Sequence, residues 1–322
     1  MPNQRVLKLL AWALLWWASS IAAQTFPSRP MKILVPSVAG SSPDIRARQI
    51  AGKLSEAFGQ PVIVENRPGA NGMIAAREAA KAPPDGHTLF LALINNAVAD
   101  TVAPDPCCRL GMELIPVSRF SMTPLVMVVN PNVPAKSLPE YLDYARAHPG
   151  KLTYAAHGPG SVSQLVGAML KMEGGVQLLE IPYKGVNSEL PDLQGGQLDT
   201  AFVVPQVIVA SIRGGRLRAL AVMARERLDI LPDVPSVPEL GLPQLEAIAW
   251  NGIFVPAGTP AAVVQALHRE LVRAYTAPDV REQLRAGGSY AAADTPEEFA
   301  AFLRAEQQKW SRVVREAGIK AQ

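Results

Sequence analysis

Short apolar runs alternate with amphipathic segments in the N-terminal third of the chain. The runs predict strands at 31–36, 61–66 and 87–93. Between the first two runs, apolar residues recur at the spacing of one helix face: Ala47, Ile50, Ala51, Leu54 and Phe58. A second helix is expected at 73–82. This strand-helix-strand-helix-strand order predicts a parallel sheet with helices on both of its faces.

The same alternation returns in the middle of the chain. We expect strands at 125–130, 151–156, 178–183, 199–204 and 216–222, with helices between them. Because this second series is so long, it favours a second sheet over a wider first one. Residues 228–243 are rich in proline and lose the periodicity, as in a long surface connection, and 247–256 is strand-like again.

Together these elements predict an α/β protein of two lobes with a ligand cleft between them. Each lobe would be a mostly parallel sheet flanked by helices. One lobe would comprise residues 24–124 plus 247–322, and the other residues 125–246. Crossing strands near 125 and 247 would join the lobes, and the final helices would return to the first lobe.

The N-terminal residues have the pattern of a cleaved secretory signal peptide. Arg5 and Lys8 precede the apolar run 9–18, and small residues follow at 19–24. The run is short for a permanent membrane anchor, which is the alternative interpretation. We therefore expect residues 1–23 to be removed and the mature protein to be exported.

The composition is that of an ordinary globular protein and argues against nucleic acid as a partner. The 322 residues are 48% hydrophobic and 18% charged, and the formal net charge is +3. Removing Arg5 and Lys8 leaves a charge of about +1, and no cluster of Lys and Arg stands out. The two cysteines, Cys107 and Cys108, are neighbours, so they predict neither a disulfide framework nor a metal site.

The segment "AGSSPD" after the first strand is longer than a simple connection requires. Ser42 is a good N-cap, Pro43 suits the first helical position, and Asp44 favours the positive end of the helix dipole. A helix start does not explain the preceding small residues, Ala39, Gly40 and Ser41. Small residues at the carboxyl end of a parallel strand leave backbone amides uncovered, which makes an anion site.

A similar construction follows the strand at 151–156. Its small-residue loop contains His157, Gly158, Pro159, Gly160 and Ser161. Ser161 and Gln164 form a capping box that begins a helix. A third segment places Tyr183, Lys184 and Gly185 just past another strand. If the two small-residue loops face each other across a cleft, they would hold an anion from both sides.

The sequence gives little support for catalysis. The nucleophile elbow, the zinc-protease motif and the two glycine-rich nucleotide motifs are all missing from the sequence. His157 and Ser161 could act as base and nucleophile, but no orienting acid is evident. The four histidines are scattered, so we predict no catalytic residues, no metal site and no cofactor.

Many stretches of the chain closely resemble the substrate-binding receptors of tripartite tricarboxylate transporters, also called Bug-type receptors. They include "GQPVIVENRPGANG" and "KAPPDGHTL", and Asp44 and Arg48 also match. In order, the matching stretches are 26–40, 59–72, 81–89, 136–155, 181–185, 192–199, 214–222, 231–243, 254–260 and 295–310. The resemblance thus runs through nearly the whole mature chain.

The resemblance implies a periplasmic, monomeric receptor without catalysis that closes on a small organic carboxylate and serves membrane transporter subunits. Carried over from the family, the ligand-holding residues are Gly40, Ser41, Ser42, Asp44, Gly158, Gly160 and Ser161. Asn95 and Asn96 match a cleft-lining segment less closely. Closure would be a hinge motion. Two alternatives are an exported sensor that signals ligand binding and, less favoured, a hydrolase or lyase that uses His157 and Ser161.

Three departures from the family pattern bear on the ligand. Gly40-Ser41 replaces a usual glycine pair, His157 replaces a serine, and Val203 stands where an acidic residue is common. The lost carboxylate argues against a ligand with an amino group, and His157 adds a group whose charge can follow pH. The hypothesis is a carboxylate without a basic amine, with aromatic and hydroxylated acids as candidates.

Overall fold

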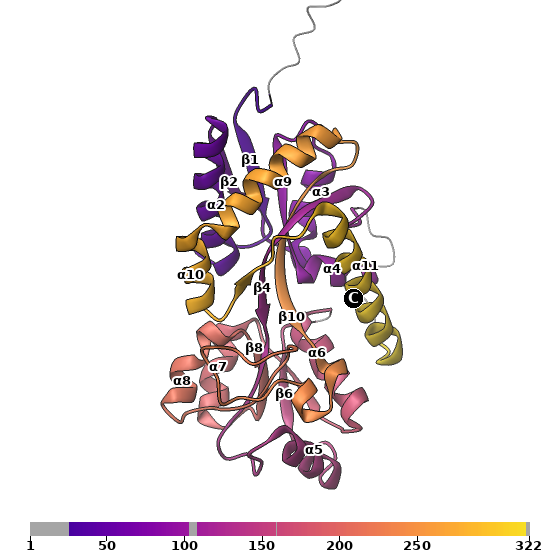
Figure 1. Cartoon of the computed structure of the whole chain (residues 1–322). Coiled ribbons are helices and arrows are strands. Elements are labelled where there is room, and N and C mark those ends of the chain that lie inside the picture. The colour runs from indigo at the N-terminus through magenta and orange to yellow at the C-terminus, as the bar shows by residue number, and fades with distance from the viewer. Residues whose placement is uncertain (1–25, 103–107, 159, 320–322) are drawn as a thin grey trace, which may run out of the picture.

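A computed structural model describes residues 26–102, 108–158 and 160–319. Two lobes lie one above the other, each built on one sheet with helices on both faces (Figure 1). The predicted signal peptide lies outside the described residues, as do Cys107 and Pro159, while Cys108 is buried. Among the described helices, none is both long and apolar enough to span a membrane.

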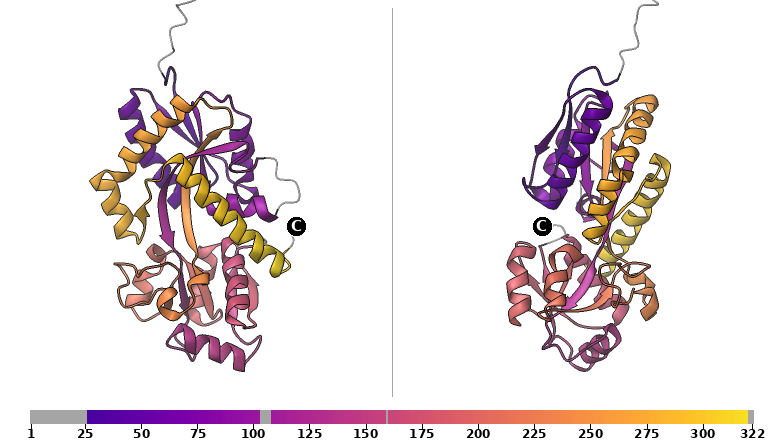
Figure 2. Two further views of the ribbon diagram at one scale, coloured as in Figure 1. Left: turned by 45° about the vertical axis from the view of Figure 1, so that its right-hand side comes forward. Right: turned by 60° about the vertical axis from the view of Figure 1, so that its left-hand side comes forward.

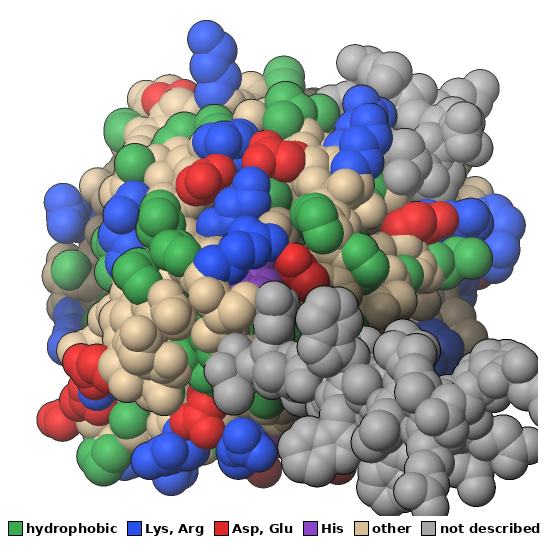
Figure 3. Space-filling view, turned by 90° about the horizontal axis from the view of Figure 1, so that it is seen from above, with side chains coloured by type: hydrophobic (Ala, Val, Ile, Leu, Met, Phe, Trp, Pro, Cys, Tyr) green, Lys and Arg blue, Asp and Glu red, His purple; other side chains and the backbone are tan. Residues whose placement is uncertain are grey.

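The first lobe contains a six-stranded sheet of order β11-β4-β10-β3-β1-β2. Its elements are β1 (Met31–Val35), α2 (Ser42–Phe58), β2 (Val62–Asn66), a 3-10 turn (Ala70–Gly72), α3 (Met73–Ala80), β3 (Thr88–Leu93), α4 (Ile94–Val102), β4 (Leu114–Pro124), β10 (Ile248–Pro256), α9 (Ala261–Thr276), α10 (Pro278–Ala286), β11 (Tyr290–Ala291) and α11 (Pro296–Glu316). Figure 3, which looks down on this lobe from the side away from the second lobe, shows basic and acidic side chains interspersed.

The second lobe contains a five-stranded sheet of order β7-β6-β8-β5-β9. Its elements are β5 (Val126–Val129), α5 (Leu138–Ala147), β6 (Thr153–Ala156), α6 (Val162–Gly174), β7 (Leu179–Pro182), α7 (Val186–Gly195), β8 (Thr200–Val203), a 3-10 turn (Pro205–Val207), α8 (Val209–Arg213), β9 (Arg218–Val222) and two further 3-10 turns (Pro238–Leu240 and Pro243–Leu245). The helix expected between the strands at 199–204 and 216–222 is thus a 3-10 turn followed by a short α-helix.

Two chain crossings connect the lobes. β4 runs into β5, and the chain returns through β10, which pairs antiparallel with β4 along its length (Figure 2). At the junction the Leu125 amide donates to the Ala247 carbonyl at 3.0 Å, and the Met223 amide donates to the Leu125 carbonyl at 2.8 Å. The second sheet and the α/β two-lobed fold are therefore confirmed.

The sheets are mixed, whereas the sequence predicted mostly parallel ones. β1 pairs in parallel with β2 and β3, but β3, β10, β4 and β11 pair antiparallel. In the second sheet β6 is parallel to β7 and β8, and β5 is antiparallel to β8 and β9. The physical reason is the double crossing, because a chain that leaves a lobe and returns beside its exit must run in the opposite direction.

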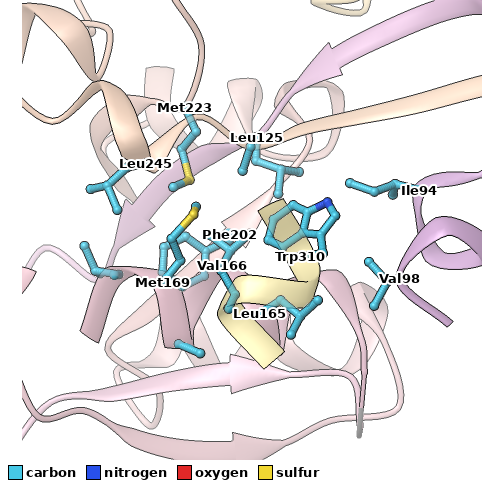
Figure 4. Packing of buried hydrophobic residues seen from close by; sticks show 14 of the residues in the cluster. Ile94, Val98, Leu125, Leu165, Val166, Met169, Phe202, Met223, Leu245 and Trp310 are labelled. Atoms are coloured by element: carbon cyan, nitrogen blue, oxygen red, sulfur yellow. The ribbon is translucent and has the colours of Figure 1, made fainter. Parts of the chain in front are cut away.

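Alternate residues of each strand pack on opposite faces of its sheet. In β1, Ile33 and Val35 pack with α2 and α9, while Leu34 packs with α3, α4 and α11. The cluster that contains Leu34 continues across the junction into the second lobe. Figure 4 shows Ile94 and Val98 of α4 and Trp310 of α11 beside side chains of α6 and β8. The two lobes therefore share one hydrophobic core.

Candidate ligand-binding cleft

The direction of the strands places the loops after β1 and β3, and those after β6 and β7, on facing edges of the two lobes. β4 runs from the first lobe into the second, and β10 is antiparallel to both β4 and β3. β3, β1 and β2 therefore also point towards the second lobe. β5 runs away from the junction and is antiparallel to β8, so β8, β6 and β7 point towards the first lobe. Ligands of open α/β sheets bind at such carboxyl ends of strands.

Asp44 stabilises the first loop, residues 39–41, through its carboxylate. Its side chain is 2% exposed, and one carboxylate oxygen accepts the Gly40 amide at 2.8 Å. Arg48 donates to the same oxygen at 3.1 Å, and Asn66 donates to the other at 2.9 Å. The bond from Arg48, with the Gly40 and Asn66 bonds, outweighs burial and lowers the pKa of Asp44 to about 2. Asp44 is thus an anionic support for the loop.

The helix after this loop begins one residue earlier than the sequence suggested. The N-cap is Ser41 rather than Ser42, and its hydroxyl lies 2.8 Å from the hydroxyl of Ser37 instead of capping an amide. Two neighbouring serines both suit a cap, and the Ser37 contact selects the first. Within the described structure the backbone amides of Ser42 and Asp44 donate to no acceptor. Ala39 and Gly40 are exposed, and Gly40 has a φ of +78°.

The second loop is held by hydroxyl groups at the start of α6. Ser161 is the N-cap, and its hydroxyl accepts the Gln164 amide at 3.3 Å and the His157 amide at 3.2 Å. Gln164 accepts the Gly160 amide at 2.8 Å, as the predicted capping residue of this turn. Gly158 and Gly160 have φ values of +94° and +70°. Among the described residues, the amides of Val162 and Ser163 have no acceptor.

The third predicted segment lies between β7 and α7. The Tyr183 hydroxyl donates to Asp192 at 2.8 Å, and partial burial with this carboxylate raises the pKa of Tyr183 to about 12. Lys184 is exposed and makes no ion pair with any described residue. Gly185 is the N-cap of α7. Tyr183 is therefore committed to its own lobe, whereas Lys184 is open to solvent.

The two asparagines after β3 have different surroundings. Asn96 is 1% exposed, accepts the Leu93 amide at 2.9 Å and donates to the Asn71 carbonyl at 3.4 Å. It fastens the turn between β2 and α3, in which Ala70 and Asn71 have φ values of +48° and +51°. Asn95 is partly exposed, and its side chain makes no hydrogen bond with the described residues. Of the pair, Asn95 has the side chain available to a ligand.

Sequence reasoning missed an acid beside the second loop. Glu189, in the first turn of α7, is 1% exposed, and its Oε2 lies 2.8 Å from Nε2 of His157. Helical spacing with Val186, Leu190 and Leu193 could have shown that Glu189 lies on the buried face of α7. Val203, where the family commonly has an acid, is 4% exposed in β8. The second lobe therefore has a carboxylate, but at a different position.

Each of the two loops is held by hydrogen bonds within its own lobe. A side chain at Gly160 would lie 3.6 Å from Val102, so the second loop lies against the end of α4. Among the described residues, no hydrogen bond or ion pair joins the first loop directly to the second. The structure thus places His157, Ser161 and Glu189 together in the second lobe and Gly40, Ser41 and Asp44 together in the first lobe.

A cavity of about 1060 Å³ lies elsewhere, beside the crossing strands. It is lined by parts of β4, β11, α10 and residues 224–230, and includes none of the predicted site residues. Its arginines are largely paired with acids, as in Arg119 with Asp294 at 2.7 Å and Arg285 with Asp229 at 2.8 Å. Such balanced charge does not suit a small anion, so the facing loops remain the better candidate.

Comparisons with known proteins identify the family. A family model described as "Tripartite tricarboxylate transporter family receptor" matches residues 46–319. Protein BugT of Bordetella pertussis is 34% identical over 305 residues, which cover 94% of each chain.

Two solved structures of relatives superpose over most of the chain. "R. palustris Rpa4515 with adipate" is 29% identical with a TM-score of 0.78, covering 92% of this chain and 99% of that one. "MatC (Rpa3494) from Rhodopseudomonas palustris with bound malate" is 32% identical with a TM-score of 0.76, covering 90% and 100%. This chain belongs to the tripartite tricarboxylate transporter receptor family.

Proposed function

We propose that this protein is a periplasmic receptor that captures a small organic carboxylate between its lobes and presents it to a tripartite tricarboxylate-type membrane transporter. The observation that carries the proposal is the pair of open helix N-termini on facing loops. The amides of Ser42 and Asp44 on one side, and of Val162 and Ser163 on the other, have no acceptor within the described structure. Such amides, with the positive helix end, suit a carboxylate.

The family confirms that the chain is a binding protein rather than an enzyme, since its members are receptors. The geometry agrees, because the His157 ring pairs with Glu189 while the Ser161 hydroxyl accepts backbone amides. A base and nucleophile would need to contact each other. The relatives with bound adipate and malate support a ligand with two carboxylates.

Isothermal calorimetry with a panel of acids tests ligand capture. The panel contains adipate, malate, citrate, hexanoate, benzoate, aspartate and glutamate. We expect an acid without an amino group to bind, and we expect Gly40→Ala to weaken its binding. If no acid of the panel binds, the proposed ligand class is wrong. If aspartate or glutamate alone binds tightly, the hypothesis of an amine-free ligand is wrong.

Two measurements test the periplasmic location and the partner. Cell fractionation with intact-mass measurement should find the protein in the periplasm, shortened by the mass of residues 1–23. Uptake of the bound acid by cells should depend on both this receptor and a membrane transporter encoded beside it. Uptake that is unchanged after deletion of the receptor gene would contradict the transport role and favour sensing.

A further inference from the structure

His157 and Glu189 form a pair at the edge of the cleft. His157 directly follows β6, and its side chain is 28% exposed. Glu189 is 1% exposed in the first turn of α7, and its Oε2 lies 2.8 Å from His157 Nε2. The loop after β6 and the helix after β7 are thus joined by a histidine on the open side and a carboxylate on the buried side.

Apart from the positive end of α7, the carboxylate of Glu189 has one charged partner among the described residues, His157. Its Oε1 is buried without a hydrogen-bond partner. On α7 and β7, Asp192 accepts the Tyr183 hydroxyl, and Glu180 accepts the Tyr154 hydroxyl at 2.6 Å. Within the described structure, His157 is the one basic side chain in ion-pair contact with Glu189. A buried charge without a partner is costly, so Glu189 favours a positively charged His157.

The second ring nitrogen of His157 is available to a ligand. Nε2 is occupied by Glu189, whereas Nδ1 makes no hydrogen bond with the described residues and is not enclosed by them. In a neutral ring whose Nε2 carries the proton, Nδ1 is an acceptor and would repel a carboxylate. In the imidazolium form, Nδ1 is a donor with a positive charge.

We propose that Glu189 is a positioning residue that keeps His157 in its imidazolium form, so that Nδ1 donates to a second carboxylate of the ligand. This inference rests on the proposed function and adds the side chain of this chain that meets the second carboxylate of its ligand. One carboxylate meets the open amides of the facing loops, and the other meets His157. The pair therefore selects a dicarboxylate over a monocarboxylate and makes its affinity depend on pH.

The test compares adipate with hexanoate, which has the same number of carbons but a single carboxylate. Calorimetry measures both from about pH 5 to pH 8, the range in which histidine changes its charge. We expect the wild-type protein to bind adipate at least tenfold more tightly than hexanoate while the His157 ring is charged, and to lose this preference wherever the ring becomes neutral. The affinity for hexanoate should change little over the same range.

Variants separate positioning from simple structural support. In Glu189→Gln the amide oxygen still accepts the Nε2 proton, but the negative charge is gone. We expect this variant to lose adipate affinity at neutral pH and to regain it at low pH. His157→Ser should bind adipate weakly at every pH. Glu140→Gln, the same change in the first turn of the remote helix α5, is the matched control and should behave as the wild type.

Thermal unfolding of every variant accompanies the binding curves, so that a loss of folded protein is recognised. If Glu189→Gln proves too unstable, the wild-type pH curve and His157→Ser still decide the matter. Equal wild-type affinities for adipate and hexanoate at every pH, or an equal loss in Glu189→Gln at every pH, overturns this inference alone. Failure of adipate, malate and every other acid of the panel to bind at any pH overturns the proposed function as well.

Discussion

Gly40 is a residue whose backbone conformation shapes the first loop. Its φ of +78° lies in the left-handed region, yet no atom lies within 4 Å of where a side chain would begin. A substitution there meets a backbone cost and no steric clash. The Gly40 amide is also the donor to Asp44, so the same residue connects the loop to its anionic support.

We expect Gly40→Ala to lower the free energy of unfolding by about 1–2 kcal/mol, the cost of a left-handed conformation for an L-residue. Gly52→Ala is the matched control, because Gly52 is an exposed residue inside α2 with equal space around it. It should raise the free energy of unfolding by roughly 0.5–1 kcal/mol. Urea denaturation measures both changes, and equal responses would contradict the role of φ.

The lowered pKa of Asp44 leads us to expect a smaller free energy of unfolding in acid. Its folded-state pKa of about 2 lies below the ordinary 3.8, so its stabilising effect is complete above about pH 4 and disappears as the pH falls to about 2. The difference in free energy of unfolding between wild type and Asp44→Asn should therefore shrink across this window. Urea denaturation at a series of pH values measures it. A difference that stays constant from pH 4 to pH 2 would show that the carboxylate charge is not responsible.

At the scale of elements, the start of α6 combines helix capping with the shape of the second loop. The Ser161 hydroxyl accepts one amide of the helix and one of the preceding loop. Ser137 caps α5 in a similar way, accepting the Glu140 amide at 3.3 Å, far from the facing loops. The Ser161 cap thus lies at the candidate site, whereas the Ser137 cap lies far from it.

Ser161→Ala and Ser137→Ala should each lower the free energy of unfolding by about 0.5–2 kcal/mol, the usual effect of losing an N-cap. Only Ser161→Ala should also weaken ligand binding, because the His157 amide loses one of its two hydroxyl acceptors and keeps only Ser163, at 3.0 Å. Thermal unfolding and calorimetry on both variants provide the comparison. Equal binding by the two variants would remove Ser161 from the site.

The elements that could be predicted from the sequence are those with a clear period. The strand at 31–36 and the helix after it have an uninterrupted apolar pattern, and the structure contains both. β4 was missed because it contains Ser118, Arg119, Ser121 and Thr123, which look like surface residues. All four are buried, and partners distant in sequence satisfy them, such as Asp294 for Arg119 at 2.7 Å. Partners so distant in the sequence cannot be predicted from the local pattern of apolar and polar residues.

The candidate site was predictable to a similar extent. Small residues after strands indicated both loops, since that signal is local. Glu189 was missed because its importance depends on His157, which is 32 residues away in the sequence. A charged residue is also expected at the surface, so its burial could not be predicted from its type. The choice of Ser41 over Ser42 as N-cap likewise depends on the side chain of Ser37.

At the scale of the whole molecule, α11 joins the two lobes. It belongs to the first lobe, yet Trp310 packs against α6 and Arg312 forms an ion pair with Glu173 of that helix (Figure 4). The same hydrophobic cluster runs from β1 to β8. We therefore expect the lobes to unfold together as one cooperative unit.

Trp310→Ala should lower the free energy of unfolding by about 3–5 kcal/mol, since it leaves a cavity in the shared cluster. Scanning calorimetry should still record one transition at a lower temperature, because both lobes depend on this contact. Arg312→Ala, which removes partly exposed ion pairs with Glu173 and Glu316, should change the free energy of unfolding by about 0–1 kcal/mol. Two separate transitions in the wild type would contradict the single unit.

The two tryptophans at the junction give the protein an internal optical probe. Three of the five tryptophans, Trp12, Trp16 and Trp17, lie within residues 1–23. The others, Trp250 on β10 and Trp310 on α11, both donate their indole N–H to Glu306, at 3.3 and 3.0 Å. In protein prepared without residues 1–23, all indole fluorescence thus comes from one carboxylate-linked pair where the lobes meet. If a ligand closes the lobes as proposed, we expect the emission of the unlabelled protein to report the change.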